Sequence, residues 1–148
     1  MEWKINHFSE LDTAELYEIL KQRINVFVVE QDCPYPECDD KDFDSYHLYA
    51  AKGDKVVAYL RIILPGVSYE EASIGRVLVH REYRGNGLGR ELMERAIEYI
   101  EEELQEDSIR LSAQEYLLDF YKSLGFKTVS DTYLEDGIPH VEMLYKSK

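Results

Sequence analysis

Arg84-Gly85-Asn86-Gly87-Leu88-Gly89-Arg90 decides how this chain is interpreted. The stretch follows an apolar run, 74–79, and opens a long amphipathic segment with the pattern of a helix. Its three glycines carry no Cβ atom, so a ligand can approach the backbone closely. Unpaired N–H groups at a helix start, with the positive end of the helix dipole, favour an anion there. The stretch therefore predicts a cradle for a diphosphate, and with it a nucleotide-bearing ligand.

The segments around this loop alternate between strand and helix patterns. Helices are predicted from a capping box at Asp12 and Glu15, from the apolar face of 88–104, and at 115–124 before Gly125. A β-branched run, 26–29, follows the first helix. Strands are predicted at 3–8, 46–51, 55–64, 74–79 and 108–113, with a final pair at 126–133 and 141–146. This order predicts a mixed α/β fold, with residues 1–148 as one domain.

Composition narrows the choice of partner. The formal charge of −13 argues against nucleic acid. Between residues 76 and 95, five arginines against three glutamates give a local charge of +2, which indicates one dedicated anion site. No apolar run is long enough to span a bilayer, and the first residues lack the pattern of a signal peptide. We therefore expect no membrane partner and a cytoplasmic location.

The acidic, proline-containing segment 32–45 has two interpretations. It is either a solvated loop or a lid that draws in a cationic amine. It has no glycine where a calcium-binding loop requires one, so we expect no metal there. Cys33 and Cys38 lack a second pair that would complete a zinc site, and we expect free thiols.

Spacing separates the glycine stretch from two common nucleotide-binding motifs. A P-loop has Gly-Lys-Ser/Thr at the helix start, where this chain has 88–90, Leu-Gly-Arg. The dinucleotide fingerprint has Gly-x-Gly-x-x-Gly, whereas Gly85, Gly87 and Gly89 alternate. A turn built from three permissive residues remains an alternative to a binding loop.

Two motifs together resemble a known family. Arg84, Gly87 and Gly89 match the Arg/Gln-x-x-Gly-x-Gly/Ala loop of the GNAT N-acetyltransferase superfamily, and 120–126, Phe-Tyr-Lys-Ser-Leu-Gly-Phe, matches its second motif. The resemblance to the ElaA-like group within it runs over almost the whole chain, and is carried by 27–31, 33–35, 74–77, 113–114 and 135–140. It implies a central, mixed, mostly antiparallel sheet flanked by helices.

The resemblance also implies a cosubstrate, acetyl-CoA. Its pantetheine arm would pair with the main chain of Val77 and Val79, and an N–H near Leu78 or Val79 would polarise the thioester carbonyl. Gln114 stands where many family members have an asparagine that contacts the cofactor. The positions implied to contact acetyl-CoA are Val77, Leu78, Val79, Arg84, Gly85, Asn86, Gly87, Leu88, Gly89, Arg90, Gln114 and Tyr121.

The implied reaction is direct attack of a primary amine on acetyl-CoA. Tyr121 is the candidate acid for the departing thiolate, or else an aromatic that packs between Phe120 and Phe126. Glu30 is the candidate base or an ordinary carboxylate at a strand end. His47 and His140 are, with Glu30, candidate substrate contacts, and with His80 they are further candidates for the base.

Other functions stay open at this point. The chain is an N-acetyltransferase, a non-catalytic acyl-CoA-binding module, or another nucleotide-binding or interaction domain. The amine is not identified by the sequence, and it is a small molecule or a protein terminus. A homodimer paired through the edge 133–143 is one further possibility.

Overall fold

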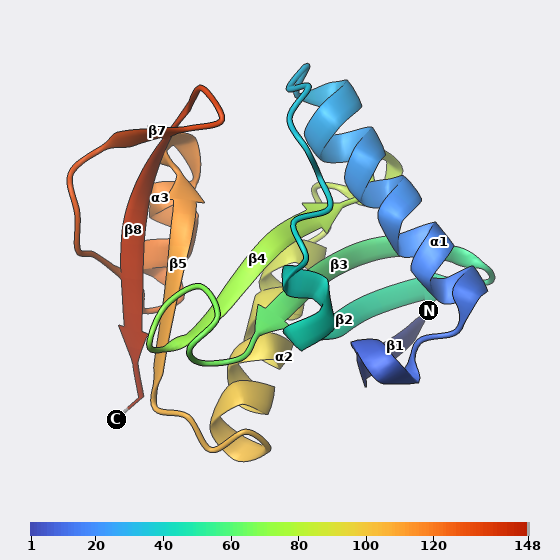
Figure 1. The fold of residues 1–148 in the computed structure, drawn as a ribbon, viewed down its shortest axis with the longest axis horizontal. Helices are drawn as coiled ribbons and strands as arrows, with labels where there is room; N and C mark the ends of the chain where they lie inside the picture. Colours follow the sequence, from blue (N-terminus) through green and yellow to red (C-terminus); the bar gives the residue numbers. More distant parts are fainter. Residues whose placement is uncertain (148) are drawn as a thin grey trace.

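A single open sheet organises the protein, in a computed structural model that describes residues 1–147 (Figure 1). Its strand order is β1-β2-β3-β4-β5-β8-β6, and β7 pairs with β8. Within the described residues, the pair β4–β5 is parallel and the others are antiparallel, which confirms a mixed, mostly antiparallel sheet. The strands are β1 (Glu2–His7), β2 (Ser45–Lys52), β3 (Lys55–Ile63), β4 (Ala72–Val79), β5 (Ser108–Gln114), β6 (Lys127–Thr128), β7 (Tyr133–Glu135) and β8 (Ile138–Lys146).

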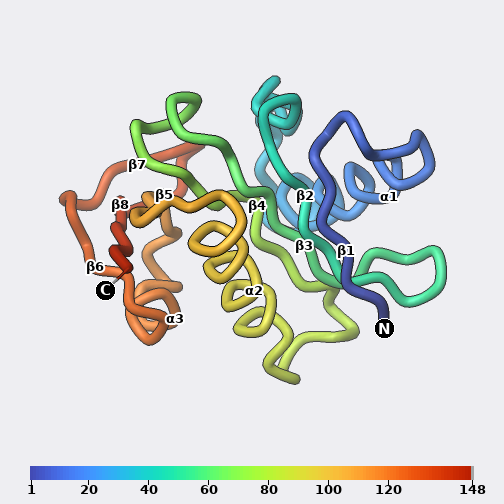
Figure 2. The backbone as a smooth tube through the Cα atoms, turned by 90° about the horizontal axis from the view of Figure 1, so that it is seen from below, coloured from blue at the N-terminus to red at the C-terminus, as the bar shows by residue number. Residues whose placement is uncertain are grey.

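Helices cover both faces of the sheet (Figure 2). They are α1 (Thr13–Arg23), α2 (Leu88–Glu102) and α3 (Leu118–Ser123). The apolar face of α2 buries Leu92, Met93 and Ile100 in the larger core, as the spacing of its apolar residues predicts. On the other face, Ile19 of α1 packs in a smaller core with Tyr59. Between residues 1 and 147, no helix is both long and apolar enough to cross a membrane.

The first helix starts as predicted and ends differently. Asp12 accepts from the Glu15 N–H at 2.7 Å, and Glu15 accepts from the Asp12 N–H at 3.0 Å, which confirms the capping box. The β-branched run 26–29 does not form a strand. The alternative that Glu30 is a carboxylate at a strand end is therefore wrong. A π-helical segment, Ile24–Glu30, continues α1 directly. Val26 is buried and Val29 is exposed, which gives the run the one-sided burial of a helix.

The final strand pair is also interrupted. The predicted strand 126–133 divides into β6 and β7, both of which pair with β8. The Ser130 hydroxyl accepts from the Glu142 N–H at 2.9 Å and donates to the Asp131 carbonyl at 2.9 Å. A side chain therefore takes the place of a backbone partner there, and the ladder breaks.

Strands β4 and β5 part soon after they begin (Figure 1). They pair only at Ala72 with Ile109 and at Ser73 with Arg110, among residues 1–147. Farther along, β4 has one extra residue relative to β3, and Arg76 lies in this bulge with a left-handed φ of 55°. The bulge bends β4, and the edge of β4 that faces β5 is left without a strand partner there.

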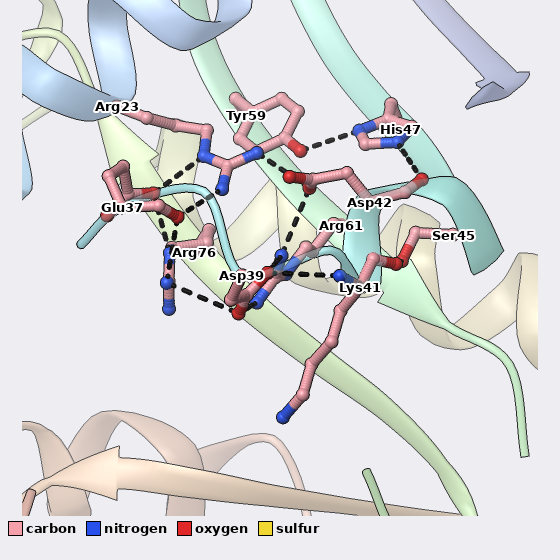
Figure 3. Close-up of polar contacts among 10 residues, drawn as sticks. All are labelled: Arg23, Glu37, Asp39, Lys41, Asp42, Ser45, His47, Tyr59, Arg61 and Arg76. Carbon is pink, nitrogen blue, oxygen red and sulfur yellow. Dashed lines mark hydrogen bonds and ion pairs between the residues drawn. The ribbon is translucent and has the colours of Figure 1, made fainter. Parts of the chain in front are cut away.

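Three acidic side chains of the loop 32–45 are tied into the protein rather than solvated (Figure 3). They meet three arginines that come from α1, β3 and the bulge in β4. The ion pairs join Arg23 to Glu37 and Asp42, Arg61 to Asp42 and Asp39, and Arg76 to Glu37 and Asp39, at N–O distances between 2.6 and 3.5 Å. Both predicted interpretations of the loop missed this buried cluster.

The cluster also sets the charge of its acids. Burial alone would raise the pKa of Asp42, but the hydrogen bonds and charges of Arg23 and Arg61 hold its pKa below the usual range. The pKa of Asp39 is lowered in the same way, against burial, by Arg61 and then Arg76. Ionised Asp42 and Asp39 therefore stabilise the fold at neutral pH.

We expect Arg23→Met to cost about 3 kcal/mol of unfolding free energy, because it leaves buried carboxylates without one of their cations. Lys21→Met is the matched control on the same helix. It breaks an exposed pair with Glu18 and should cost about 1 kcal/mol or less. Urea unfolding at pH 7 measures both, and similar small losses would contradict the buried role of Arg23.

The loss caused by Arg23→Met should also depend on pH. A carboxyl with a lowered folded pKa stabilises the protein above its unfolded pKa of about 4, and this contribution disappears as the pH falls. The gap between wild type and Arg23→Met should therefore shrink on acidification below about pH 4. Repeating the urea titrations toward pH 3 checks this, and a constant gap would count against the ion pair with Asp42.

Candidate active site

The glycine stretch forms an open, uncapped helix start. Gly85 and Gly87 have φ values of 84° and 76°, which favour glycine, and no atom lies within 4 Å of the place of a Cβ at either. Gly87 is the N-cap of α2 and offers no side-chain hydrogen bond. The N–H groups of the first turn of this 15-residue helix therefore remain available to an anion. This geometry fits a diphosphate.

Two arginines flank this helix start. Arg84 donates from Nε to the Val79 carbonyl at 2.8 Å and forms an ion pair with Glu30 at 2.9 Å. Arg90 donates to the Ser123 hydroxyl on the other side of the loop. Both side chains are thus held beside the glycines by partners that a charged ligand can replace.

The sequence indicated that the local charge of +2 belongs to one anion site. In the structure, not all of these arginines lie at the glycine loop. Arg76 belongs to the buried ion cluster. Arg95 pairs with Glu91 at 2.9 Å and lies over the ring of Trp3, 4.4 Å from its centroid. The anion site therefore rests on fewer arginines than the count along the chain implies.

A cavity of about 440 Å³ occupies the opening between β4 and β5. It brings together candidates from four elements, namely Val77 of β4, Gln114 of β5, Tyr121 of α3 and His140 of β8. Arg76, Glu37 and Asp39 form part of its wall, so the buried ion cluster also shapes this cavity. Neither Glu30 nor His47 lines it.

Tyr121 lies in the wall of this cavity with only 6% of its surface exposed. It packs edge-on against Phe120 and Phe126, at ring distances of 5.2 and 6.0 Å. Burial raises the pKa of Tyr121 well above its usual value, so the phenol keeps its proton at neutral pH. Packing and a proton-donating position are therefore compatible in this residue.

Gln114 reaches across the opening to a residue that sequence reasoning missed. Its amide exchanges hydrogen bonds with that of Gln31, at 3.4 and 3.5 Å. Gln31 directly follows the π-helical segment, so the pair connects this segment to the end of β5. The one available signal was that Gln31 lies in the segment 27–31 that resembles the ElaA-like group.

The candidate histidines have different surroundings. His47 is fully buried, with Nδ1 against the Tyr59 hydroxyl at 2.7 Å and Nε2 against the Asp42 carbonyl at 3.1 Å (Figure 3). Burial lowers the pKa of His47, and both ring nitrogens are occupied, which supports a structural role. His80 accepts from the Glu82 N–H at 3.2 Å in the turn after β4. His140 faces the cavity.

Within residues 1–147, no three His, Cys, Asp or Glu side chains gather in a way that would hold a metal ion. Cys33 and Cys38 are free thiols, as predicted.

Comparison with known proteins places these features in a family. Residues 15–147 match the family model described as an acetyltransferase (GNAT) domain. A UPF0039 protein of Schizosaccharomyces pombe is 47% identical to this chain, and protein ElaA of Escherichia coli is 41% identical. Each alignment covers 97% of this chain and 95% of the relative.

Solved structures agree with the sequence relatives. An acyl-CoA N-acyltransferase from Pseudomonas aeruginosa has a TM-score of 0.92 at 41% identity. The crystal structure of Escherichia coli ElaA has a TM-score of 0.91 at 40% identity. Both superpositions cover 98% of this chain and 99% of the other. The comparisons confirm the family that the two sequence motifs indicated. This chain belongs to the GNAT acetyltransferase family, in its ElaA-like group.

Proposed function

We propose that this protein transfers an acetyl group from acetyl-CoA to a primary amine. One observation carries the proposal: the cavity in the opening between β4 and β5 is lined by Val77 and by a buried Tyr121, and β4 leads along the chain into the uncapped glycine loop at the start of α2. A loop that accepts a diphosphate and an open strand edge that accepts an extended arm together suit the two parts of an acyl-CoA. Membership of the GNAT family supports acyl transfer in general.

The unpaired edge of β4 would hold the donor. The main chain of Val77 and Val79 would pair with the extended arm, and an N–H near Leu78 or Val79 would stabilise the oxyanion. Arg84 and Arg90 would exchange their present partners for phosphate oxygens, and the N–H groups from Gly85 to Gly89 would complete the cradle. The side-chain amide of Gln114 lines the cavity, where it would contact the thioester end of the bound acetyl-CoA.

The amine nitrogen would attack the thioester carbonyl carbon, and the carbon–sulfur bond would break with its electron pair going to sulfur. Tyr121 would give its proton to that thiolate, which its burial in a protonated form supports. Glu30 lies outside the cavity and pairs with Arg84. That placement supports a role in holding an arginine of the cradle rather than the base.

The reaction itself is tested by thiol release from acetyl-CoA in the presence of a mixed library of primary amines and peptides. We expect at least one amine to release thiol and to gain an acetyl group, detected by mass spectrometry. Tight binding of acetyl-CoA without release for any member of the library would support a non-catalytic acyl-CoA-binding module instead.

Replacing both Arg84 and Arg90 by Ala should weaken CoA binding about 10- to 100-fold, because two charge-assisted contacts to phosphate are lost. Arg95→Ala is the control from the same arginine-rich stretch, and its CoA affinity should change by about twofold or less, because Arg95 packs on Trp3. Calorimetric titration with CoA measures all three proteins. Unchanged affinity in the double variant would refute the cradle.

Tyr121→Phe should lower kcat about 10- to 100-fold while the Kd for CoA changes by about twofold or less, because only the donated proton is removed. Turnover and CoA titration are compared on the same preparation. An equal loss in turnover and in CoA affinity would mean that Tyr121 acts through packing alone.

A further inference from the structure

We propose that His140 is the general base that accepts the proton of the acceptor ammonium, and that Glu135 is its positioning residue. The inference rests on the proposed function and goes beyond it, because it assigns the base and the side from which the amine arrives. It stands on the arrangement of β5, β7 and β8 at the cavity.

His140 presents one ring nitrogen to the cavity region. It is the cross-strand partner of Gln114, and both line the cavity. Its Nδ1 lies 2.6 Å from the Ile138 carbonyl, which can only accept, so Nδ1 carries the hydrogen. In the neutral ring, Nε2 then holds a lone pair and can take up a proton. The shorter contact, at Nδ1, thus favours the tautomer that a base requires.

Glu135 stands where it would stabilise the protonated ring. Its Oε2 lies 3.5 Å from Nε2 of His140, and its Oε1 accepts from the Ser112 hydroxyl at 3.2 Å. The carboxylate is therefore placed to attract the imidazolium once the ring has taken up a proton. The ring of Tyr133 lies nearly parallel to that of His140, at a centroid distance of 6.3 Å and an interplanar angle of 26°. The His140 ring is oriented from its other nitrogen by the Ile138 carbonyl, and Glu135 lies on the side of the nitrogen that takes the proton.

The charge of the cavity wall favours the same side for the amine. Glu37 and Asp39 are matched by arginines of the buried cluster. In contrast, no lysine or arginine of residues 1–147 lies within ion-pair distance of Glu135. Asp136, the next residue, also lines the cavity. The β7–β8 wall thus keeps negative charge that attracts an ammonium group.

The proton and electron balance is complete with these groups. The ammonium gives one proton to Nε2 of His140, and the freed nitrogen lone pair forms the bond to the carbonyl carbon. When the carbon–sulfur bond breaks, sulfur takes the electron pair and the Tyr121 proton. The nitrogen's second proton restores the phenol through solvent, and His140 then releases its proton to water. The products are the acetylated amine, CoA thiol and one proton.

A pH profile separates His140 from its neighbours. Titratable and charged side chains face His140 or share its cavity from the π-helical segment onward: Cys33, Tyr35, Glu37, Asp39, Lys41, Arg61, Tyr69, Arg76, Tyr121, Tyr133, Glu135 and Asp136. Glu37, Asp39, Arg61 and Arg76 belong to the ion cluster. Burial raises the pKa of Tyr69 to about 12 and also raises that of Tyr121 and Tyr133. None of these phenols therefore changes charge near neutral pH, where an imidazole does.

The kinetic test uses the amine from the mixed library that the wild-type protein acetylates fastest. His140→Gln should lower kcat/KM about 100- to 10,000-fold and abolish the acid limb of the pH profile, with acetyl-CoA affinity unchanged. Glu135→Gln should give a smaller loss, about tenfold, mainly in kcat. His7→Gln, the same change at a histidine of β1, should keep turnover within about twofold. Wild-type turnover with an unchanged pH profile in His140→Gln would overturn the proposal.

A second measurement is independent of the acceptor. Nitrogen-15 spectra of the imidazoles, assigned with the His140→Gln protein, should show the Nδ1–H tautomer of His140 at pH 8. An Nε2–H tautomer would overturn the base, even in an active enzyme. Failure of every library amine to release thiol would overturn the proposed function and the base with it, whatever the tautomer, so the two failures are distinguishable.

Discussion

The parting of β4 and β5 is the constraint on which the candidate site depends. It requires a bulge in β4 at which Arg76, a residue with a Cβ, adopts a left-handed conformation. That conformation costs about 1–2 kcal/mol. The ion pairs of Arg76 with Glu37 and Asp39 offset this cost and bind the loop 32–45 to the bulge. A buried ion cluster that lies outside the proposed catalytic residues thus helps to shape the cavity.

The opening divides the proposed reaction between two sides. The glycine loop and the edge of β4 supply backbone N–H groups, which suit a large anionic donor such as an acyl-CoA. The wall from β7 and β8 supplies His140 and Glu135, which suit the amine and its proton. Glu30 connects to the first side through Arg84. The sequence motifs describe mostly the first side, which explains why they indicate an acyl-CoA but no acceptor.

Local features were predictable from the sequence and distant ones were not. The capping box at Asp12, the end of α3 just before Gly125 and the start of α2 at Leu88 depend on residues within one or two turns. The pairs of Arg23 with Glu37 and Asp42 join residues 14 and 19 positions apart and need the folded sheet. The run 26–29 suggested a strand end at Glu30 because β-branched residues favour strands, whereas its one-sided burial against the sheet stabilises a helical form.

Backbone hydrogen exchange with and without acetyl-CoA tests the central claim, that the opening between β4 and β5 receives the donor. The account predicts slower exchange at residues 77–79 and 84–90 on adding acetyl-CoA, little change in β1, and no such protection by ATP at the same concentration. Equal protection by ATP would contradict the account. So would protection confined to the smaller cavity lined by Trp3 and Tyr99, on the α2 face of the sheet.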